Sequence, residues 1–172
     1  MDIIYKRRSI RRYKPGSVTR DQVLAVIKAG MNAPSAGNEQ PWQFIVIDRR
    51  VTLEEIMKVH PYAQMLKEVT TAILLCGDLE RETRQGFWVQ DCAAAAENML
   101  LAAVAEGLGS VWLGVHPRED RVTGMRRILG IPESVVPFAL FPLGIPGEEK
   151  ERKNEYHPQL IHHNGWSEPF PG

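Results

Sequence analysis

The feature that most constrains the fold of this chain is the alternation of short apolar runs with longer helical patterns. Four apolar runs have the length and composition of buried strands, at residues 44–47, 72–77, 110–115 and 136–143. Helical patterns precede or separate them, at residues 20–30, 53–59, 88–106 and 118–129. Such alternation is typical of a sheet covered by helices, so a layered α/β or α+β class is predicted. The length of 172 residues suits a single domain, residues 1–172, with a substantial core.

Local signals set the expected helix ends. Thr19 with Gln22, and Thr52 with Glu55, have the spacing of capping boxes and predict helix starts at about residues 20 and 53. Gly107 is the predicted C-cap of the 88–106 helix. That helix is rich in alanine, which suits burial inside the fold or at a subunit interface. Pro137 lies within the fourth apolar run and favours an edge strand or a strand start.

The charges balance overall but are unevenly distributed. The chain has 21 basic and 21 acidic residues, and a nucleic-acid-binding domain normally has a basic excess, so no nucleic-acid partner is expected. Residues 1–14, however, contain a basic cluster with Asp2 as the single acidic residue. The cluster consists of Lys6, Arg7, Arg8, Arg11, Arg12 and Lys14.

The cysteines and the apolar stretches indicate the cellular compartment. Cys76 and Cys92 lie in apolar runs and form no C-x-x-C pair, so both are predicted to be buried small residues in a reducing compartment. The N-terminal residues lack the apolar run of a secretion signal. The longest apolar stretch, residues 92–105, is interrupted and too short to span a bilayer. A cytoplasmic protein without membrane association is expected.

No familiar catalytic constellation is present. The chain lacks G-x-S-x-G, H-E-x-x-H and P-loop patterns, so no catalytic side chain and no metal site are predicted. Asp91 and Glu97 lie six residues apart in a helical pattern and do not share a face. They are therefore expected to pair with an arginine or join a buried network rather than act as an acid–base pair. The histidines are interpreted as loop or tail residues: His60, His116, His162 and His163.

Two segments are richer in binding groups than a simple turn requires. Arg7-Arg8-Ser9-Ile10-Arg11 places three guanidinium groups and a hydroxyl within five residues, a set suited to a phosphate dianion. Residues 33–42, Ala-Pro-Ser-Ala-Gly-Asn-Glu-Gln-Pro-Trp, carry amides and hydroxyls suited to a polar ring or a sugar-like chain. From the residues alone, a solvated basic segment and a structural turn remain as alternatives.

Together with Gly-Leu-Gly-Ser-Val-Trp-Leu-Gly at 107–114, these segments resemble the FMN-dependent nitroreductase family, over about residues 3–166. The resemblance implies an α+β fold of three layers, in which helices flank a central, mainly antiparallel sheet. It also implies an intertwined homodimer with one noncovalent FMN per subunit at the dimer interface. The unpatterned C-terminal extension, residues 147–172, is expected to pack on the partner subunit.

The resemblance also implies a set of cofactor-binding residues, taken over position by position. Those expected at the FMN phosphate and ribityl chain are Arg7, Arg8, Ser9 and Arg11. Those expected in a loop that the partner subunit lays against the flavin are Pro34, Ser35 and Ala36, with Asn38 and Gln40 nearby. The backbone of Leu113 and Gly114 is expected at the flavin ring and its N5, and Gln64 at the pyrimidine edge.

The tail departs from the family pattern. Many members carry a basic residue with an arginine two positions later, just before an aromatic residue. Arg152 and Lys153 are assigned to this contact, although Glu155 rather than a basic residue precedes Tyr156.

The activity implied is transfer of hydride from NAD(P)H through FMN to a nitroaromatic, quinone or flavin acceptor by a ping-pong mechanism. The cofactor carries the chemistry, which agrees with the lack of a catalytic constellation. Two alternatives are kept. One is a flavin-destroying or dehalogenating enzyme on the same scaffold, and the other is a non-enzymatic binder that uses the basic N-terminus.

Overall fold

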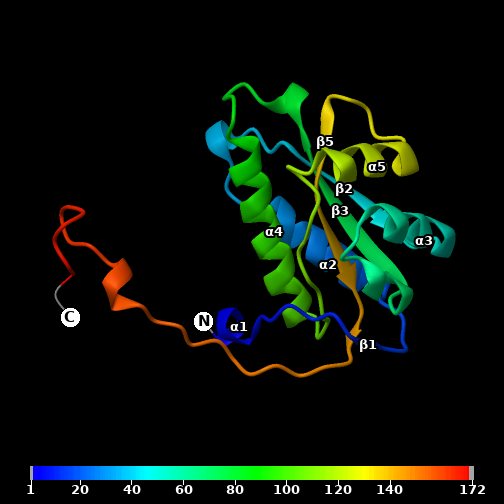
Figure 1. Ribbon diagram of the computed structural model, residues 1–172, viewed down its shortest axis with the longest axis horizontal. Helices are drawn as coiled ribbons and strands as arrows, with labels where there is room; N and C mark the ends of the chain where they lie inside the picture. The colour runs from blue at the N-terminus through cyan, green and yellow to red at the C-terminus, as the bar shows by residue number, and fades with distance from the viewer. Residues whose placement is uncertain (1, 171–172) are drawn as a thin grey trace.

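A central antiparallel sheet organises the molecule, which a computed structural model describes over residues 2–170 (Figure 1). Its strand order is β2-β3-β5-β4. The strands are β2 (Trp42–Ile47), β3 (Thr71–Asp78), β4 (Leu113–Gly114) and β5 (Val135–Leu143). The register aligns one apolar row across all four strands: Ile45, Leu74, Leu140 and Leu113.

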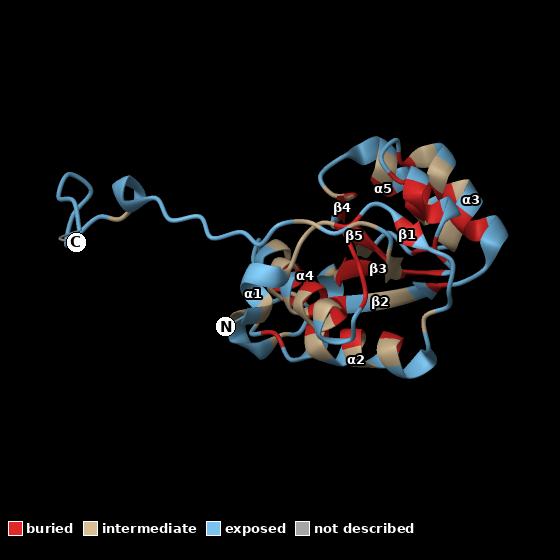
Figure 2. Ribbon diagram, turned by 90° about the horizontal axis from the view of Figure 1, so that it is seen from below, coloured by how far each residue is buried: buried red, intermediate tan, exposed pale blue. Residues whose placement is uncertain are grey.

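Helices cover both faces of this sheet and complete three layers (Figure 2). The helices α2 (Arg20–Met31) and α4 (Trp88–Ala105) pack on one face, while α3 (Arg50–Val59) and α5 (Glu119–Leu129) pack on the other. In β3, Ile73 and Leu75 face α2 and α4, whereas Leu74 and Cys76 face the opposite helices. A strand buried on both faces needs apolar residues at every position, which explains its uninterrupted apolar run. The predicted α+β class is confirmed.

The helix-start predictions had different outcomes. Thr19 caps α2, and its capping box with Gln22 is formed. The second capping box is wrong, because α3 begins at Arg50 and has no side-chain cap. Thr52 instead lies inside the first turn and is buried against the core, so its hydroxyl is not at a capping position.

The predicted ends of the long helix and of the fourth strand are largely confirmed. Gly107 follows α4 with a φ of 71°, a left-handed conformation that glycine adopts without strain. Pro137 lies near the start of β5, where pairing with β3 shifts register between Leu75 and Cys76. The strand-start prediction holds, but β5 is an inner strand, and the shift in register accommodates the proline. Both cysteines are buried, as predicted.

The third strand is shorter than the predicted 110–115 run. Only Leu113–Gly114 forms β4, because the Ser110 carbonyl accepts a hydrogen bond from the Ile10 N–H at 2.9 Å. The N-terminal segment thus lies beside residues 109–110 and follows α1 (Asp2–Lys6). It continues into β1 (Tyr13–Lys14), which pairs antiparallel with β6 (Ile145–Pro146). Short 3-10 turns complete the fold, at Ala36–Asn38, Gln64–Lys67, Leu79–Arg81 and Pro158–Leu160.

The tail leaves the body after β6 and extends away from it (Figures 1 and 2). From residue 151 to 170 all but one of its residues are exposed. Large apolar side chains are among them: Tyr156, Leu160, Trp166 and Phe170. In the part of the chain that the structure describes, no helix is long and apolar enough to cross a membrane.

Candidate functional site

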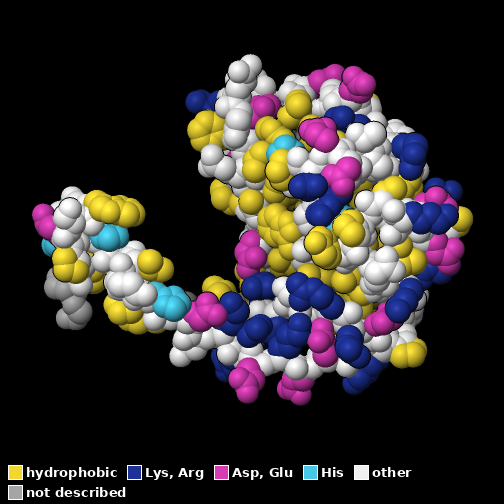
Figure 3. Space-filling model, in the orientation of Figure 1, with side chains coloured by type: hydrophobic (Ala, Val, Ile, Leu, Met, Phe, Trp, Pro, Cys, Tyr) yellow, Lys and Arg dark blue, Asp and Glu magenta, His cyan; other side chains and the backbone are white. Residues whose placement is uncertain are grey.

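A cavity of about 390 Å³ lies at the C-terminal end of α4 and is bordered by basic side chains. Its basic lining residues are Lys6, Arg8, Lys150 and Arg152. Its apolar wall includes Ile10, Val104 and Leu108, and its acidic lining residues are Glu148 and Glu149. Figure 3 shows the Lys and Arg side chains gathered across this part of the molecule, where α1 and the N-terminal segment lie in Figure 1. We call this space the basic cavity.

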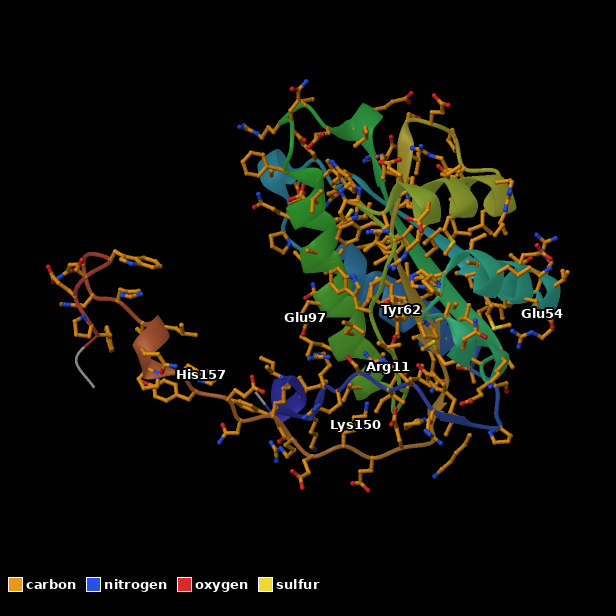
Figure 4. The ribbon with its side chains drawn as sticks, viewed as in Figure 1. Arg11, Glu54, Tyr62, Glu97, Lys150 and His157 are labelled. Carbon is orange, nitrogen blue, oxygen red and sulfur yellow. The ribbon has the colours of Figure 1, made fainter. Side chains whose placement is uncertain are left out.

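The cavity is formed by two segments that are far apart in the sequence. Residues 147–153, here called the tail root, run alongside the N-terminal segment, as the neighbouring positions of Arg11 and Lys150 show in Figure 4. The Gly147 N–H donates to the Arg12 carbonyl at 2.8 Å, and the Lys150 ammonium donates to the Ser9 carbonyl at 2.5 Å. The predicted phosphate-binding segment is therefore held in shape by the start of the tail.

Glu148 fixes the backbone of the same segment. Its carboxylate accepts hydrogen bonds from the N–H groups of Arg11 at 2.6 Å and Arg12 at 3.3 Å, and it lies 3.4 Å from the Lys150 ammonium. The Arg11 N–H and the Lys150 charge favour the ionised carboxylate and lower the pKa of Glu148. The carboxylate thus stays charged at neutral pH inside a basic surrounding.

The predicted basic residues occupy different positions around the cavity. Arg8 lines it, and so does Arg152, which also pairs with Asp2. Arg7 pairs with Glu97 of α4 at 3.3 Å. Lys153 directs its ammonium to Glu155 at 2.8 Å, and it does not line the basic cavity.

Lys150 is a residue that the sequence reasoning missed. It lies two positions before Arg152, which is the spacing expected for the basic pair of the tail. Arg152 and Lys153 are instead the basic residues nearest to the aromatic Tyr156 in the sequence. The spacing of the two basic residues, without the requirement for an aromatic neighbour, identifies Lys150.

A second element of the site is the free edge of β4. In an antiparallel pair of strands, one residue directs its N–H and C=O toward the partner strand, and the next residue directs both away from it. The Val115 N–H donates to Phe138 of β5, so the preceding residue, Gly114, faces away from β5. Its carbonyl accepts hydrogen bonds from His60 Nε2 at 3.0 Å and Arg121 Nη1 at 2.7 Å. In an extended residue the N–H and C=O lie on the same side, so the Gly114 N–H also points away from β5.

His60 follows the last residue of α3 and lies outside any helix or strand, as predicted, but it is buried. Only 1% of its surface is exposed, and both ring nitrogens are engaged. Nδ1 lies 3.3 Å from the Tyr62 N–H and accepts from it, so Nε2 carries the proton and donates to Gly114. Burial lowers the pKa of His60 and favours the neutral ring.

The 33–40 loop lies at the opposite end of α4. The Ala36 N–H donates to the buried Asp91 carboxylate at 3.0 Å, and the Gln40 N–H donates to the Ser35 hydroxyl at 3.0 Å. From Asp91 to Val104 of the cavity wall, the helix rises by about 20 Å. The loop and the basic cavity are therefore not brought together within one chain.

The remaining predicted residues have simple placements. Leu113 is buried in the core and so contributes only its backbone to the edge of β4. Pro34 and Asn38 are exposed, and Asn38 accepts a hydrogen bond from Gln40 at 3.3 Å. Gln64 is exposed on a 3-10 turn, and its amide lies 3.4 Å from the Met57 carbonyl. The prediction that Asp91 and Glu97 serve as partners rather than an acid–base pair is confirmed.

These features define an α+β protein with a cavity bordered by basic side chains and with β4 at the edge of its sheet. The model of the nitroreductase family matches residues 4–75 and 54–145, and the chain therefore belongs to the nitroreductase family and is an enzyme of that type. A relative in Methanothermobacter thermautotrophicus, provisionally named an NADH dehydrogenase/NAD(P)H nitroreductase, is 46% identical over 166 residues, which cover 96% of this chain and 87% of the relative.

Solved structures extend the comparison. An FMN-dependent nitroreductase from Clostridium difficile is 28% identical with a TM-score of 0.87, and the match covers 95% of this chain and 98% of that one. A provisionally assigned nitroreductase from Desulfovibrio desulfuricans, solved in complex with FMN, is 30% identical with a TM-score of 0.83, over 99% of this chain and 96% of that one.

Proposed function

We propose that the protein is an FMN-dependent oxidoreductase that uses NAD(P)H to reduce nitroaromatic, quinone or flavin-type acceptors. The observation that carries this proposal is the basic cavity at one end of an open strand edge. An elongated ligand with an anionic end and a planar polar ring matches those two elements in that order. The names of the relatives support both FMN and NAD(P)H.

The residues present fit FMN on chemical grounds. A phosphate dianion needs cationic donors, and Arg8, Lys150 and Arg152 border one cavity. The ring of a flavin needs backbone donors and acceptors, and the edge of β4 at Gly114 faces away from its own sheet. We assign the phosphate and ribityl end to Arg8, Ser9, Arg11, Lys150 and Arg152. Arg7 belongs to the same end.

FMN, when bound, supplies the two-electron redox chemistry between the nicotinamide donor and the acceptor. The chain's own residues bind and orient it. The guanidinium and ammonium groups neutralise the phosphate charge, and the Gly114 N–H faces the side where a ring can lie. A backbone N–H at that position stabilises negative charge without a proton transfer, as in other preorganised donor sites. No side chain then has to act as an acid, a base or a nucleophile.

We also propose that the working unit is a homodimer whose sites contain residues of both chains. The 33–40 loop is about a helix length from the basic cavity of its own chain, and the exposed apolar tail has no surface of its own body to cover it. An interface that buries the tail is expected to exceed about 2,000 Å². The two buried thiols agree with a reducing, cytoplasmic setting.

Anaerobic reduction tests the activity. The purified protein is expected to be yellow, to bleach with NADH or NADPH, and to regain its colour with p-benzoquinone or a nitroaromatic compound. Initial rates at several donor and acceptor concentrations should give parallel double-reciprocal lines. A colourless protein that takes up no FMN contradicts the proposal, and intersecting lines contradict the ping-pong mechanism alone.

Subunit mixing tests the composite site. A variant damaged in the basic cavity, Arg8→Ala with Lys150→Ala, is refolded together with a variant crowded in the loop, Ser35→Tyr. If the loop comes from the partner, each mixed dimer has one site that carries both defects and one intact site, and activity should return. If loop and cavity of one chain share a site, every site in the mixture stays damaged.

A further inference from the structure

The backbone of Gly114 is held by side chains rather than by its own packing. Glycine has the greatest backbone freedom, and a Cβ at Gly114 would meet no atom within 4 Å. Its carbonyl also lies on the side of β4 away from β5, so it is not fixed by the ladder with that strand. The orientation of this residue therefore depends on the two donors that reach its carbonyl, His60 and Arg121.

Both donors are themselves fixed. His60 is buried at the end of α3, and the Tyr62 N–H on Nδ1 selects the ring tautomer that donates from Nε2. The Arg121 guanidinium lies 5.4 Å from the centre of the Tyr62 ring. Its Nε is buried without a partner among the described residues. Buried donors are usually hydrogen-bonded. In the conformation in which Nη1 reaches the Gly114 carbonyl, Arg121 therefore lacks the hydrogen bond that its Nε would normally make.

From this arrangement we infer that His60, supported by Arg121, is a positioning residue for the flavin-facing backbone of β4. The inference rests on the proposed function, which assigns the Gly114 edge to the flavin ring. In an extended residue the N–H and C=O point to the same side. Two donors on the carbonyl therefore also restrict the direction of the Gly114 N–H, the group proposed to stabilise charge on the ring. His60 itself need not touch FMN.

The reduction potential of the bound cofactor is the property that tests this role. His60→Leu removes the donor but keeps an apolar side chain in the buried position. We expect the bound cofactor's preference for the reduced form to fall about tenfold, which lowers a two-electron potential by about 30 mV. His60→Gln retains an N–H donor and should stay within about threefold of the parent protein. Titration against a dye of known potential measures the shift.

A matched control separates positioning from loss of stability. Leu53→Ala makes a cavity in α3, in the core cluster that also contains Leu113 and Val115, and it removes no donor to the Gly114 carbonyl. It should lower the melting temperature at least as much as His60→Leu and leave the potential unchanged. If His60→Leu does not fold, Arg121→Met removes the other donor and is expected to shift the potential in the same direction.

The outcomes separate this inference from the proposed function. If the parent protein binds FMN but neither His60→Leu nor Arg121→Met changes the potential, the positioning role is wrong and the proposed function stands. An equal shift in Leu53→Ala also overturns it, since the effect is then one of general loosening. If the parent protein binds no FMN, both proposals fall.

Discussion

The two ends of α4 carry the two halves of the predicted site, and they are built differently. At the C-terminal end, the basic cavity combines the N-terminal segment with the tail root through charged side chains. At the N-terminal end, the 33–40 loop is held by hydrogen bonds to two carboxylates. The Ala36 N–H donates to Asp91, and the Thr83 N–H donates to Glu39 of the loop. Both ends join segments that are distant in sequence, but one is built around the basic side chains of the tail root and the other around carboxylates.

The difference predicts which change in the chain should damage each end of the site. The basic cavity depends on long-range contacts, so cutting the tail should dismantle it. The 33–40 loop needs no residue of the tail, and loss of the buried Asp91 carboxylate should weaken it. The two ends should therefore fail separately.

Truncation at the tail root should have the largest effect. Removal of residues 147–172 takes away the Gly147 and Glu148 contacts to the N-terminal segment and the basic side chains of Lys150 and Arg152. We expect FMN binding to weaken by more than the two cations alone contribute, which is about 3–6 kcal/mol at roughly 1.5–3 kcal/mol for each charge-assisted contact. Flavin fluorescence titration measures the loss.

A variant with a smaller deletion is the control for this experiment. Removal of residues 155–172 keeps the tail root but deletes the exposed apolar arm. The variant that lacks residues 155–172 should retain the basic cavity and bind FMN far more tightly than the variant that lacks residues 147–172. Its dimer should dissociate at a higher protein concentration than the dimer of the parent protein, which light scattering measures. Equal loss of FMN in both forms would place the decisive tail contacts beyond residue 154.

Loss of two cations from the cavity should have the next largest effect. Arg8→Ala with Lys150→Ala is expected to weaken FMN binding by about 3–6 kcal/mol, from two charged contacts. Lys14→Ala, an exposed charge on β1 outside the cavity, is the matched control and should change affinity less than threefold. The double variant is expected to leave the loop at the other end of α4 unaffected. Unchanged FMN affinity in the double variant would remove the basic cavity from the site.

The sequence predicted the features that depend on neighbouring residues, and it did not predict the contacts between distant segments. Three arginines within five residues predict an anion-binding segment by composition, and the capping box of Thr19 and the alternating runs identify α2 and the strands. Lys150 was missed because its role depends on where the tail root runs. His60 was missed because a histidine before a proline resembles a loop residue, whereas its burial follows from the packing of α3 beside β4. Contacts between distant segments leave little local pattern.

Asp91 should control the stability of the other end. Asp91→Ala leaves the Ala36 N–H without its acceptor and should lower the unfolding free energy by about 1–3 kcal/mol. Asp91→Asn keeps an acceptor oxygen and should cost less, mainly the loss of a negative charge near the start of α4, about 0.3–1 kcal/mol. Urea denaturation measures both. If alanine and asparagine cost the same, the hydrogen bond to the loop contributes nothing measurable.

Glu148 should give the smallest effect, and one that depends on pH. Its folded-state pKa is lowered from the ordinary value of 4.5, chiefly by the Arg11 N–H and also by the Lys150 charge. A group with a lowered pKa stabilises the folded state above its unfolded pKa, and this contribution disappears as the pH falls through the folded value. Glu148→Gln should therefore be less stable than the parent protein at neutral pH, by about 1 kcal/mol or less for a carboxylate so near the surface.

The difference between the two proteins should shrink as the pH falls below 4.5, because the parent carboxyl then becomes neutral as well. Urea denaturation of both proteins at matched pH values measures this difference, in which the titration of all other groups largely cancels. If the difference in unfolding free energy stays constant down to strongly acidic pH, then the shape of the Glu148 side chain, and not its charge, holds Arg11 and Arg12 in place.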